Sequence, residues 1–268
     1  MSLLVKAAAG LGAAATVATG GYFLFAGGSI EVFVISEQGS VDSTIYGTNT
    51  FGNAYADYMA DPGEEKNKPF WEESFKKWQN DKNVKKMQFG KKFENVGFAY
   101  KGDQETNNNT ALNQICKAAF KESKENVASN VDDTDTTKFK ESEVWKYCSA
   151  SRTGSKPVLL KDSQVKEDAD LIAATESPET WGKKSKEHLV STKDTSNDWF
   201  WELREKKFRS EQDSTEASEK NIFKIRKKSG NTVKQTCQEA YVLSSTNNEG
   251  KVTETDLKKY CYFEKTTQ

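Results

Sequence analysis

Four cysteines carry the strongest potential for covalent chemistry in this 268-residue chain. They are Cys116, Cys148, Cys237 and Cys261, and no two of them form a CxxC pair. Four cysteines allow three disulfide pairings. Their wide spacing is not that of metal ligands, so disulfides or buried reduced thiols are favoured over a metal cluster or a reactive thiol.

Two serines precede a lysine at the SxxK spacing that some acyl-enzymes use. Ser74 stands before Lys77 and Ser163 before Lys166, but no companion motif follows, and such matches arise freely in a chain rich in serine and lysine.

The segment Asp132–Asp135 resembles the start of a calcium loop without its glycine and closing glutamate. We therefore expect a solvated loop there, and no catalytic, cofactor-binding or metal-binding residues.

The composition excludes several classes of function. The single histidine, His188, leaves no zinc pair and no HExxH motif, and we interpret it as an exposed helix residue. The net charge of -1 lacks the basic excess of a nucleic-acid-binding protein. No phosphate-binding loop or dinucleotide fingerprint is present. With 35% apolar and 29% charged residues, the chain has little material for a core.

The first 28 residues form an Ala/Gly-rich segment. Residues 7–28 carry no charge, and a helix of about 22 residues spans about 33 Å, which is enough to cross a bilayer core. So many small residues make insertion marginal. We expect a signal anchor or transmembrane helix over 1–28. A secretory signal cleaved near Ala18–Gly21 and a buried helix of a soluble protein are the alternatives.

The charges on either side of this segment predict its orientation. Lys6 precedes it, while Glu31 and Glu37 follow it. By the positive-inside tendency, the N-terminus is cytoplasmic and the rest of the chain is extracellular. The lipid bilayer is thus an expected partner, and the localisation is a single-pass cell-membrane protein. Cleavage of the signal would instead give a secreted protein.

An internal repeat organises the remainder of the chain. Rare residues recur in the same order, and the offset shrinks at each step, as two insertions in the first copy would produce. Those insertions fall in polar stretches around Gly102–Asn109 and Asn126–Thr137. The matching segments are Trp71–Trp78 with Trp201–Phe208, Cys116–Phe120 with Cys237–Tyr241, and Glu143–Cys148 with Asp256–Cys261.

Each copy is expected to contain three helices. In the first copy, a helix begins at Pro69, a second opens at Thr110, and a third runs from Asp135 or Thr136 to Cys148. In the second copy, Ser196 or Asn197 is expected to cap the first helix, and Thr253 with Asp256 matches a capping box before the last. Seven aromatic residues are assigned to the core rather than to binding a sugar or a partner: Trp71, Trp78, Trp145, Tyr147, Trp201, Phe208 and Tyr260.

The predicted fold is therefore mainly α, with an N-terminal helix followed by two three-helix repeats. Residues 30–35 are either a strand or a continuation of the N-terminal helix. A short helix started near Ser177-Pro178 is expected to contain Trp181 and Leu189. The predicted parts are an anchor (1–28), a juxtamembrane segment (29–68), repeat 1 (69–150), a linker (151–197) and repeat 2 (198–268).

The repeat also selects one disulfide pairing. Equivalent cysteines should pair within each copy, which predicts Cys116–Cys148 and Cys237–Cys261. Each bond would tie the second helix of a copy to its third. Closing such loops contributes about 3–4 kcal/mol each in the chain-entropy model, which suits an extracellular chain with a small core.

The Ala/Gly-rich start LLVKAAAGLGAAATVATGGYF, scattered tryptophans and the ending Trp145-Lys146-Tyr147-Cys148 carry a resemblance. In this layout the chain resembles the paralogous families of uncharacterised, membrane-anchored surface proteins of haemotropic mycoplasmas. The resemblance implies surface display and a role in antigenic variation or in contact with host-cell or immune proteins. It names no catalytic residues.

We therefore expect a membrane-anchored surface protein that contacts host factors or varies antigenically. The alternatives are an extracellular binding module for a small nutrient and, less favoured because the motifs are missing, an enzyme. A deep pocket lined by charged groups would favour the alternatives, whereas a convex polar surface would favour the first interpretation.

Overall fold

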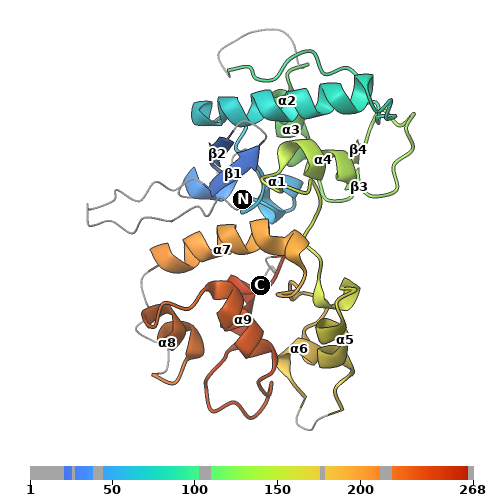
Figure 1. Ribbon diagram of the computed structural model, residues 1–268. Coiled ribbons are helices and arrows are strands. Elements are labelled where there is room, and N and C mark those ends of the chain that lie inside the picture. Colours follow the sequence, from blue (N-terminus) through green and yellow to red (C-terminus); the bar gives the residue numbers. More distant parts are fainter. Residues whose placement is uncertain are drawn as a thin grey trace, which may run out of the picture.

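The computed structural model describes residues 21–25, 28–38, 45–102, 110–175, 179–211 and 219–264, and within them the protein is mainly helical. The elements form two groups, one above the other in Figure 1, with α7 along the boundary between them. The upper group contains α1 (Phe51–Ala54), α2 (Lys68–Asn83), α3 (Leu112–Lys121) and α4 (Glu141–Cys148). The lower group contains α5 (Lys166–Ala173), α6 (Trp181–Lys184), α7 (Asp198–Ser210), α8 (Ile222–Lys228), α9 (Val233–Tyr241) and α10 (Glu254–Tyr260).

The end of the predicted N-terminal helix is a β-hairpin. Strand β1 (Gly21–Phe25) pairs antiparallel with β2 (Gly28–Val32), and Tyr22 lies opposite Glu31. The helix prediction is therefore wrong for Gly21–Phe25. Residues 30–35 were expected to be either a strand or a continuation of that helix, and they are a strand as far as Val32. Aromatic and β-branched side chains favour an extended backbone, which explains the difference. Residues 1–20 lie outside the described residues.

None of the helices in the described part of the chain is both long and apolar enough to cross a membrane. Two helices begin where their local sequence predicts, whereas Asn197 precedes α7 without capping it through its side chain. α2 has Pro69 in its first turn and buries Trp71 and Trp78 on one face, as the aromatic stripe predicts. α10 begins with the capping box of Thr253 and Asp256.

Helix α4 begins later than predicted, at Glu141, because a strand and two turns precede it. Strand β4 (Phe139–Lys140) pairs in parallel with β3 (Val127–Ala128). Before it, the Asp132 carboxylate accepts a hydrogen bond from the Thr134 backbone N–H at 2.8 Å, and Asp135 accepts one from Thr137 at 2.7 Å. These side chains compete with a helix for the backbone donors.

The segment 151–197 holds more structure than the single short helix expected. α5 was not predicted, and α6 is the short helix around Trp181, capped by Thr180. Leu189 lies beyond the end of α6 and is fully buried, whereas Ser177 and Pro178 lie outside the described residues. α5 escaped prediction because it buries little of its surface, so it lacks a clear apolar stripe.

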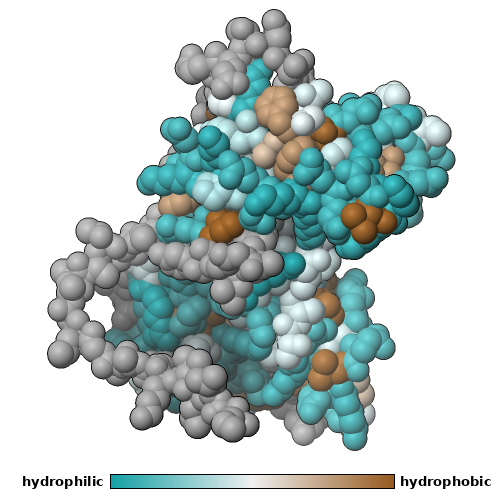
Figure 2. Space-filling view, turned by 45° about the horizontal axis from the view of Figure 1, so that its top comes forward, coloured by the Kyte–Doolittle hydropathy of each residue, from teal (hydrophilic) through white to brown (hydrophobic). Residues whose placement is uncertain are grey.

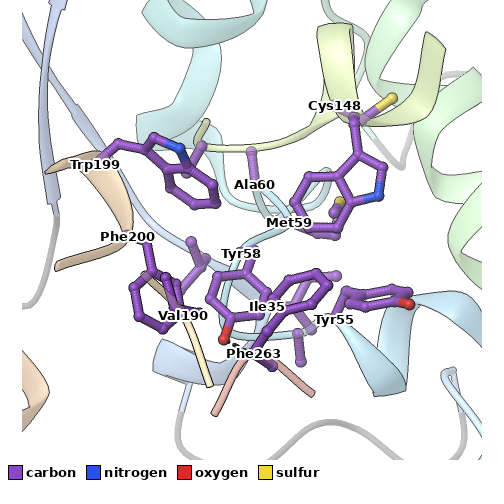
Figure 3. Packing of buried hydrophobic residues seen from close by; sticks show 14 of the residues in the cluster. Ile35, Tyr55, Tyr58, Met59, Ala60, Cys148, Val190, Trp199, Phe200 and Phe263 are labelled. Atoms are coloured by element: carbon purple, nitrogen blue, oxygen red, sulfur yellow. Dashed lines mark hydrogen bonds between the residues drawn. The ribbon is translucent and has the colours of Figure 1, made fainter. Parts of the chain in front are cut away.

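One aromatic core connects the two groups of helices. Figure 3 shows Tyr58 close to Ile35, Phe200 and Phe263, which come from distant parts of the chain. The Tyr58 and Phe200 ring centroids lie 5.8 Å apart in a stacked arrangement. The seven aromatic residues assigned to the core are all buried: Trp71, Trp78, Trp145, Tyr147, Trp201, Phe208 and Tyr260. Aromatic rings thus supply the buried area that aliphatic residues supply in most domains.

Candidate functional site

The four cysteines form two buried disulfides, so no cysteine thiol is free. Cys116 of α3 pairs with Cys148 of α4, with 5.6 Å between the Cα atoms. Cys237 of α9 pairs with Cys261, which follows α10, with 5.8 Å between the Cα atoms. These are the two pairings that the repeat predicts. All four residues are fully buried, so the bonds are structural.

The serines of both SxxK matches are held by structural hydrogen bonds. Ser74 Oγ donates to the carbonyl oxygen of Tyr147 at 2.6 Å, which fastens α2 to α4. Lys77 Nζ donates to the carbonyl oxygen of Lys146 at 3.3 Å. Ser163 Oγ donates to the Asp168 carboxylate at 2.6 Å and so closes the turn that precedes α5. The geometry therefore assigns each of these serines a docking or capping contact.

The remaining candidates for metal chemistry also have local partners. Asp132 and Asp135 accept hydrogen bonds from the threonines of their own loop. Within the described ranges, no group of three or more His, Cys, Asp and Glu residues is placed to hold a metal ion. His188 is exposed, in the turn after α6 rather than in a helix, and its ring stacks on Tyr262 with 5.3 Å between centroids.

A buried carboxylate, Asp81 of α2, forms the centre of an ionic cluster that the sequence reading missed. Its side chain is fully buried and lies 2.8 Å from Lys85 Nζ and 2.6 Å from Lys146 Nζ. It also accepts a hydrogen bond from the Tyr147 hydroxyl at 2.8 Å. Burial raises its pKa, but the hydrogen bonds from Lys146, Lys85 and Tyr147 outweigh burial and hold the pKa at about 2. The Asp81-Lys85 spacing of one helical turn was the only sequence signal for this cluster.

A second carboxyl of the same region, Glu143 of α4, has the opposite behaviour. Its side chain is buried, and Oε1 accepts a hydrogen bond from the Gly90 backbone N–H at 2.8 Å. Burial is the largest cause that raises its pKa to about 7, against smaller opposing effects of Gly90, Lys140 and Lys146. Burial raises the pKa of the Tyr147 hydroxyl, and the negative charges of Asp81 and Glu143 raise it further. Two carboxyls with separated pKa values are a pattern of acid–base sites, but structural networks also produce it.

Arg204 of α7 is the most enclosed cation of the described chain. Its side chain is 4% exposed, and Nη1 lies 3.0 Å from Asp57 Oδ2. Nη2 donates to the Tyr58 hydroxyl and, at 3.2 Å, to the carbonyl oxygen of Tyr262. The guanidinium also lies over the rings of Tyr58 and Phe200. Because Asp57 and Tyr58 belong to the first half of the chain and Arg204 to the second, this cluster joins the halves.

The outer face of α3 borders a solvent-open groove of about 670 Å³. Three lysines and a buried aromatic ring contribute to its walls, which are lined by Lys92, Gln114, Ile115, Lys117, Ala118, Lys121 and Phe139. Elsewhere, the face shown in Figure 2 is mostly hydrophilic, and its hydrophobic residues form separate small groups. The groove combines charge with an apolar lining, as small-molecule sites do.

Comparisons with protein-family models, with curated proteins and with solved structures gave no match for this chain.

Proposed function

We propose that the chain is a membrane-anchored surface protein whose helical ectodomain contacts partners outside the cell, and that this ectodomain consists of two copies of one unit. The two buried disulfides carry the proposal. Disulfides persist in oxidising compartments and are rare in the cytosol, so they support an extracellular location.

The disulfides also suit a chain with a limited core. They close loops between residues separated by 32 and 24 positions, and such loops contribute about 3–4 kcal/mol each in the chain-entropy model. For the attachment to the membrane, the support is the Ala/Gly-rich start of the chain with Lys6 in its first part. Because a hairpin begins at Gly21, the proposed anchor is confined to residues 1–20, and about 20 residues are enough to span a bilayer core.

Equivalent buried asparagines support the two-copy proposal. Asn67 and Asn197 each stand directly before one of the long helices α2 and α7. Asn67 accepts a hydrogen bond from the Phe33 N–H and donates to the Phe33 and Asp61 carbonyl oxygens. Asn197 accepts from the Val158 N–H and donates to the Val158 and Ser191 carbonyl oxygens. Each side chain thus makes three hydrogen bonds to two residues, one of which lies six positions upstream in both halves.

The short helices α1 and α6 provide a second, independent correspondence. Thr50 caps α1, and Thr180 caps α6, each by accepting a hydrogen bond from the third residue that follows. The first residue of each helix donates to the segment that follows α3 or α9: the Phe51 N–H to Glu122 and the Trp181 N–H to Leu243.

The segments that hydrogen-bond to the second cysteine of each disulfide correspond as well. The Ala60 N–H donates to the Cys148 carbonyl oxygen, and the Val190 N–H donates to that of Cys261, both at 3.0 Å. These contacts lie upstream of Pro69 and of Asp198. The proposed unit therefore also takes in parts of the segments 29–68 and 151–197, and is longer than three helices.

Partner contact, rather than catalysis, is the proposed activity. The Ser74 and Ser163 hydroxyls are engaged in structural bonds, and a groove at the surface beside α3 is open to a ligand. The partners proposed from the resemblance of the sequence are host-cell or immune proteins. The groove favours the second candidate, a binding module for a small ligand.

Protease treatment of intact cells tests the display. The chain carries a C-terminal tag, and a cytosolic protein serves as the control for lysis. We expect the tagged fragment to disappear while the cytosolic protein stays intact. Maleimide labelling of the denatured chain should modify no cysteine before reduction and all four after it. Protection of the tag until lysis, or labelling without reductant, would contradict the proposal.

A further inference from the structure

The groove beside α3 is built from one face of that helix. Gln114, Lys117, Ala118 and Lys121 follow the spacing of a single helical face, which points away from the disulfide of Cys116. Across from this face lie Phe139 of β4 and Lys92 of the segment between α2 and α3. The Cys116–Cys148 bond holds α3 in place and the pairing with β3 holds Phe139 of β4, so these two walls of the groove are fixed by the fold.

The lining is cationic. Lys92, Lys117 and Lys121 line the groove, and no acidic residue is among the described residues that do so. Lys92 Nζ lies 5.2 Å from the centre of the Phe139 ring, so the ammonium group sits at the aromatic wall. The ammonium groups of Lys92 and Lys121 attract a ligand that carries negative charge, whereas Lys117 is also attracted to the Asp61 carboxylate.

The rest of the lining is apolar. Ile115, Ala118 and Phe139 contribute aliphatic and aromatic surface between the lysines. The groove of about 670 Å³ falls within the range of about 300–1,000 Å³ that small-molecule sites occupy. A polyanion would use charge alone, whereas a small ligand with an apolar body would use both parts of this lining.

We propose that this groove binds a small amphipathic anion. Its apolar body, aromatic or aliphatic, packs against Ile115 and Phe139, and its carboxylate, sulfonate or phosphate group accepts hydrogen bonds from Lys92 and Lys121. This site goes beyond the proposed surface display, because binding to the purified protein does not depend on where the protein resides.

The second half of the chain supplies a natural contrast. In the first half, the residues one, two and five positions after Cys116 are Lys117, Ala118 and Lys121. In the second half, the residues at the same positions after Cys237 are Gln238, Glu239 and Val242. Glu239 accepts two hydrogen bonds from Arg226, at 2.7 and 2.9 Å. The corresponding face of α9 is therefore not cationic, and we expect one site in the protein, on α3.

Calorimetric titration of the purified full-length chain with naphthalene-2-sulfonate tests the site. The neutral analogue 2-naphthalenemethanol serves as the matched ligand control. We expect the sulfonate to bind at a single site and the alcohol to bind about tenfold more weakly or not at all, which is the loss that a charge-assisted hydrogen bond commonly carries.

Two variants localise the binding. Lys92→Gln with Lys121→Gln should weaken binding about tenfold. Ala118→Glu, which places the carboxylate of the α9 sequence in the groove at an exposed helical position, should abolish it. The control variant Lys76→Gln with Lys161→Gln removes the same charge from exposed lysines outside the groove and should bind as the unmodified chain does. Circular dichroism checks that each variant is folded.

Three results with the sulfonate would overturn the proposal. They are equal affinity for the sulfonate and the alcohol, unchanged affinity in the folded Lys92/Lys121 variant, and an equal loss in the Lys76/Lys161 control, which would reveal attraction to overall charge. Binding of a heparin oligosaccharide without binding of naphthalene-2-sulfonate would also overturn it, in favour of a polyanion.

Discussion

Arg204 Nη1 donates a hydrogen bond to Asp57 Oδ2 at 3.0 Å, across the boundary between the two halves of the chain. The bond lies beside the aromatic contact of Tyr58 with Phe200, so charge and rings share one junction. A buried arginine is costly unless it is paired, and here the carboxylate, the Tyr58 hydroxyl and the Tyr262 carbonyl oxygen accept its hydrogen bonds. A substitution of either Arg204 or Asp57 should therefore weaken the packing between the two halves.

We expect Arg204→Ala to destabilise the protein by about 3–5 kcal/mol, because the substitution removes the buried cation at 3.0 Å from Asp57 and leaves the half-exposed Lys207 at 3.6 Å. Urea unfolding monitored by tryptophan fluorescence gives the free energy. The double variant Arg204→Met with Asp57→Asn, which removes both charges, should lose less than Arg204→Ala. If Arg204→Ala unfolds within about 0.5 kcal/mol of the unmodified chain, the junction is not what holds the halves together.

The two disulfides offer a matched pair of removals. Cys116→Ala with Cys148→Ala opens a loop of 32 residues, and Cys237→Ala with Cys261→Ala opens one of 24. Each variant should lose about 3–4 kcal/mol, with a slightly larger loss for the longer loop. Guanidinium unfolding before and after reduction of the unmodified chain measures the combined effect. A variant as stable as the oxidised chain would show that its bond does not constrain the unfolded state.

Glu143 makes stability depend on pH near neutrality. Its pKa in the folded protein is about 7, above the ordinary 4.5, so the folded state favours the protonated form. The stabilisation is fully present below about pH 4.5 and is lost as the pH rises through 7. We expect Glu143→Gln, which stays neutral, to remove this loss and to exceed the unmodified chain in stability at pH 8 by an amount on the order of 2–3 kcal/mol.

The measurement for Glu143 is the free energy of unfolding between about pH 5 and 8. Asp81 supplies the control of opposite sign. Its pKa of about 2 lies below the ordinary 3.8, so its contribution is present above pH 3.8 and is lost only as the pH falls toward 2. Asp81→Asn should therefore lower stability across the whole neutral range without changing its slope there. Equal slopes for Glu143→Gln and the unmodified chain would exclude Glu143 as the titrating group.

Two glycines in corresponding positions should behave alike. A Cβ at Gly52 would lie 2.8 Å from both the Cβ and the carbonyl oxygen of Phe120, and a Cβ at Gly182 would lie 3.0 Å from the Tyr241 carbonyl oxygen. We expect Gly52→Ala and Gly182→Ala each to cost about 1–3 kcal/mol through overpacking. Gly47→Ala, where the Cβ meets open space, is the control and should stay within about 0.5 kcal/mol. If Gly52→Ala leaves the free energy of unfolding unchanged, α1 can move away from α3 to make room for the Cβ.

Local patterns in the sequence predicted local structure well. The aromatic stripe of α2 and the capping box of Thr253 and Asp256 involve residues a few positions apart, so their spacing alone specifies them. The pairing of the cysteines followed from recurrent residues around them. The hairpin at Gly21 was predicted as a helix, because an uncharged apolar run reads the same in both conformations.

The buried charges could not be predicted in the same way. Asp81 contacts Lys146 and Tyr147, and Arg204 forms an ion pair with Asp57. These partners lie many residues apart along the chain, so the periodicity of a helix or strand does not reveal them. The groove of α3 was missed for a related reason. Lys117 and Lys121 look like ordinary solvated lysines until Lys92 and Phe139 are brought opposite them.

The amino-acid sequence by itself determined the helical class and the capping of α10, which depend on propensity and on spacing over a few residues. It also determined the aromatic core, through composition, and which cysteines pair, through residues that recur along the chain. Only the tertiary structure decided that Gly21–Phe25 is a strand, that Arg204 joins the halves and that Glu143 has a pKa near 7. Hydrogen-bond partners, burial and the resulting electrostatics depend on which distant residues the fold brings together.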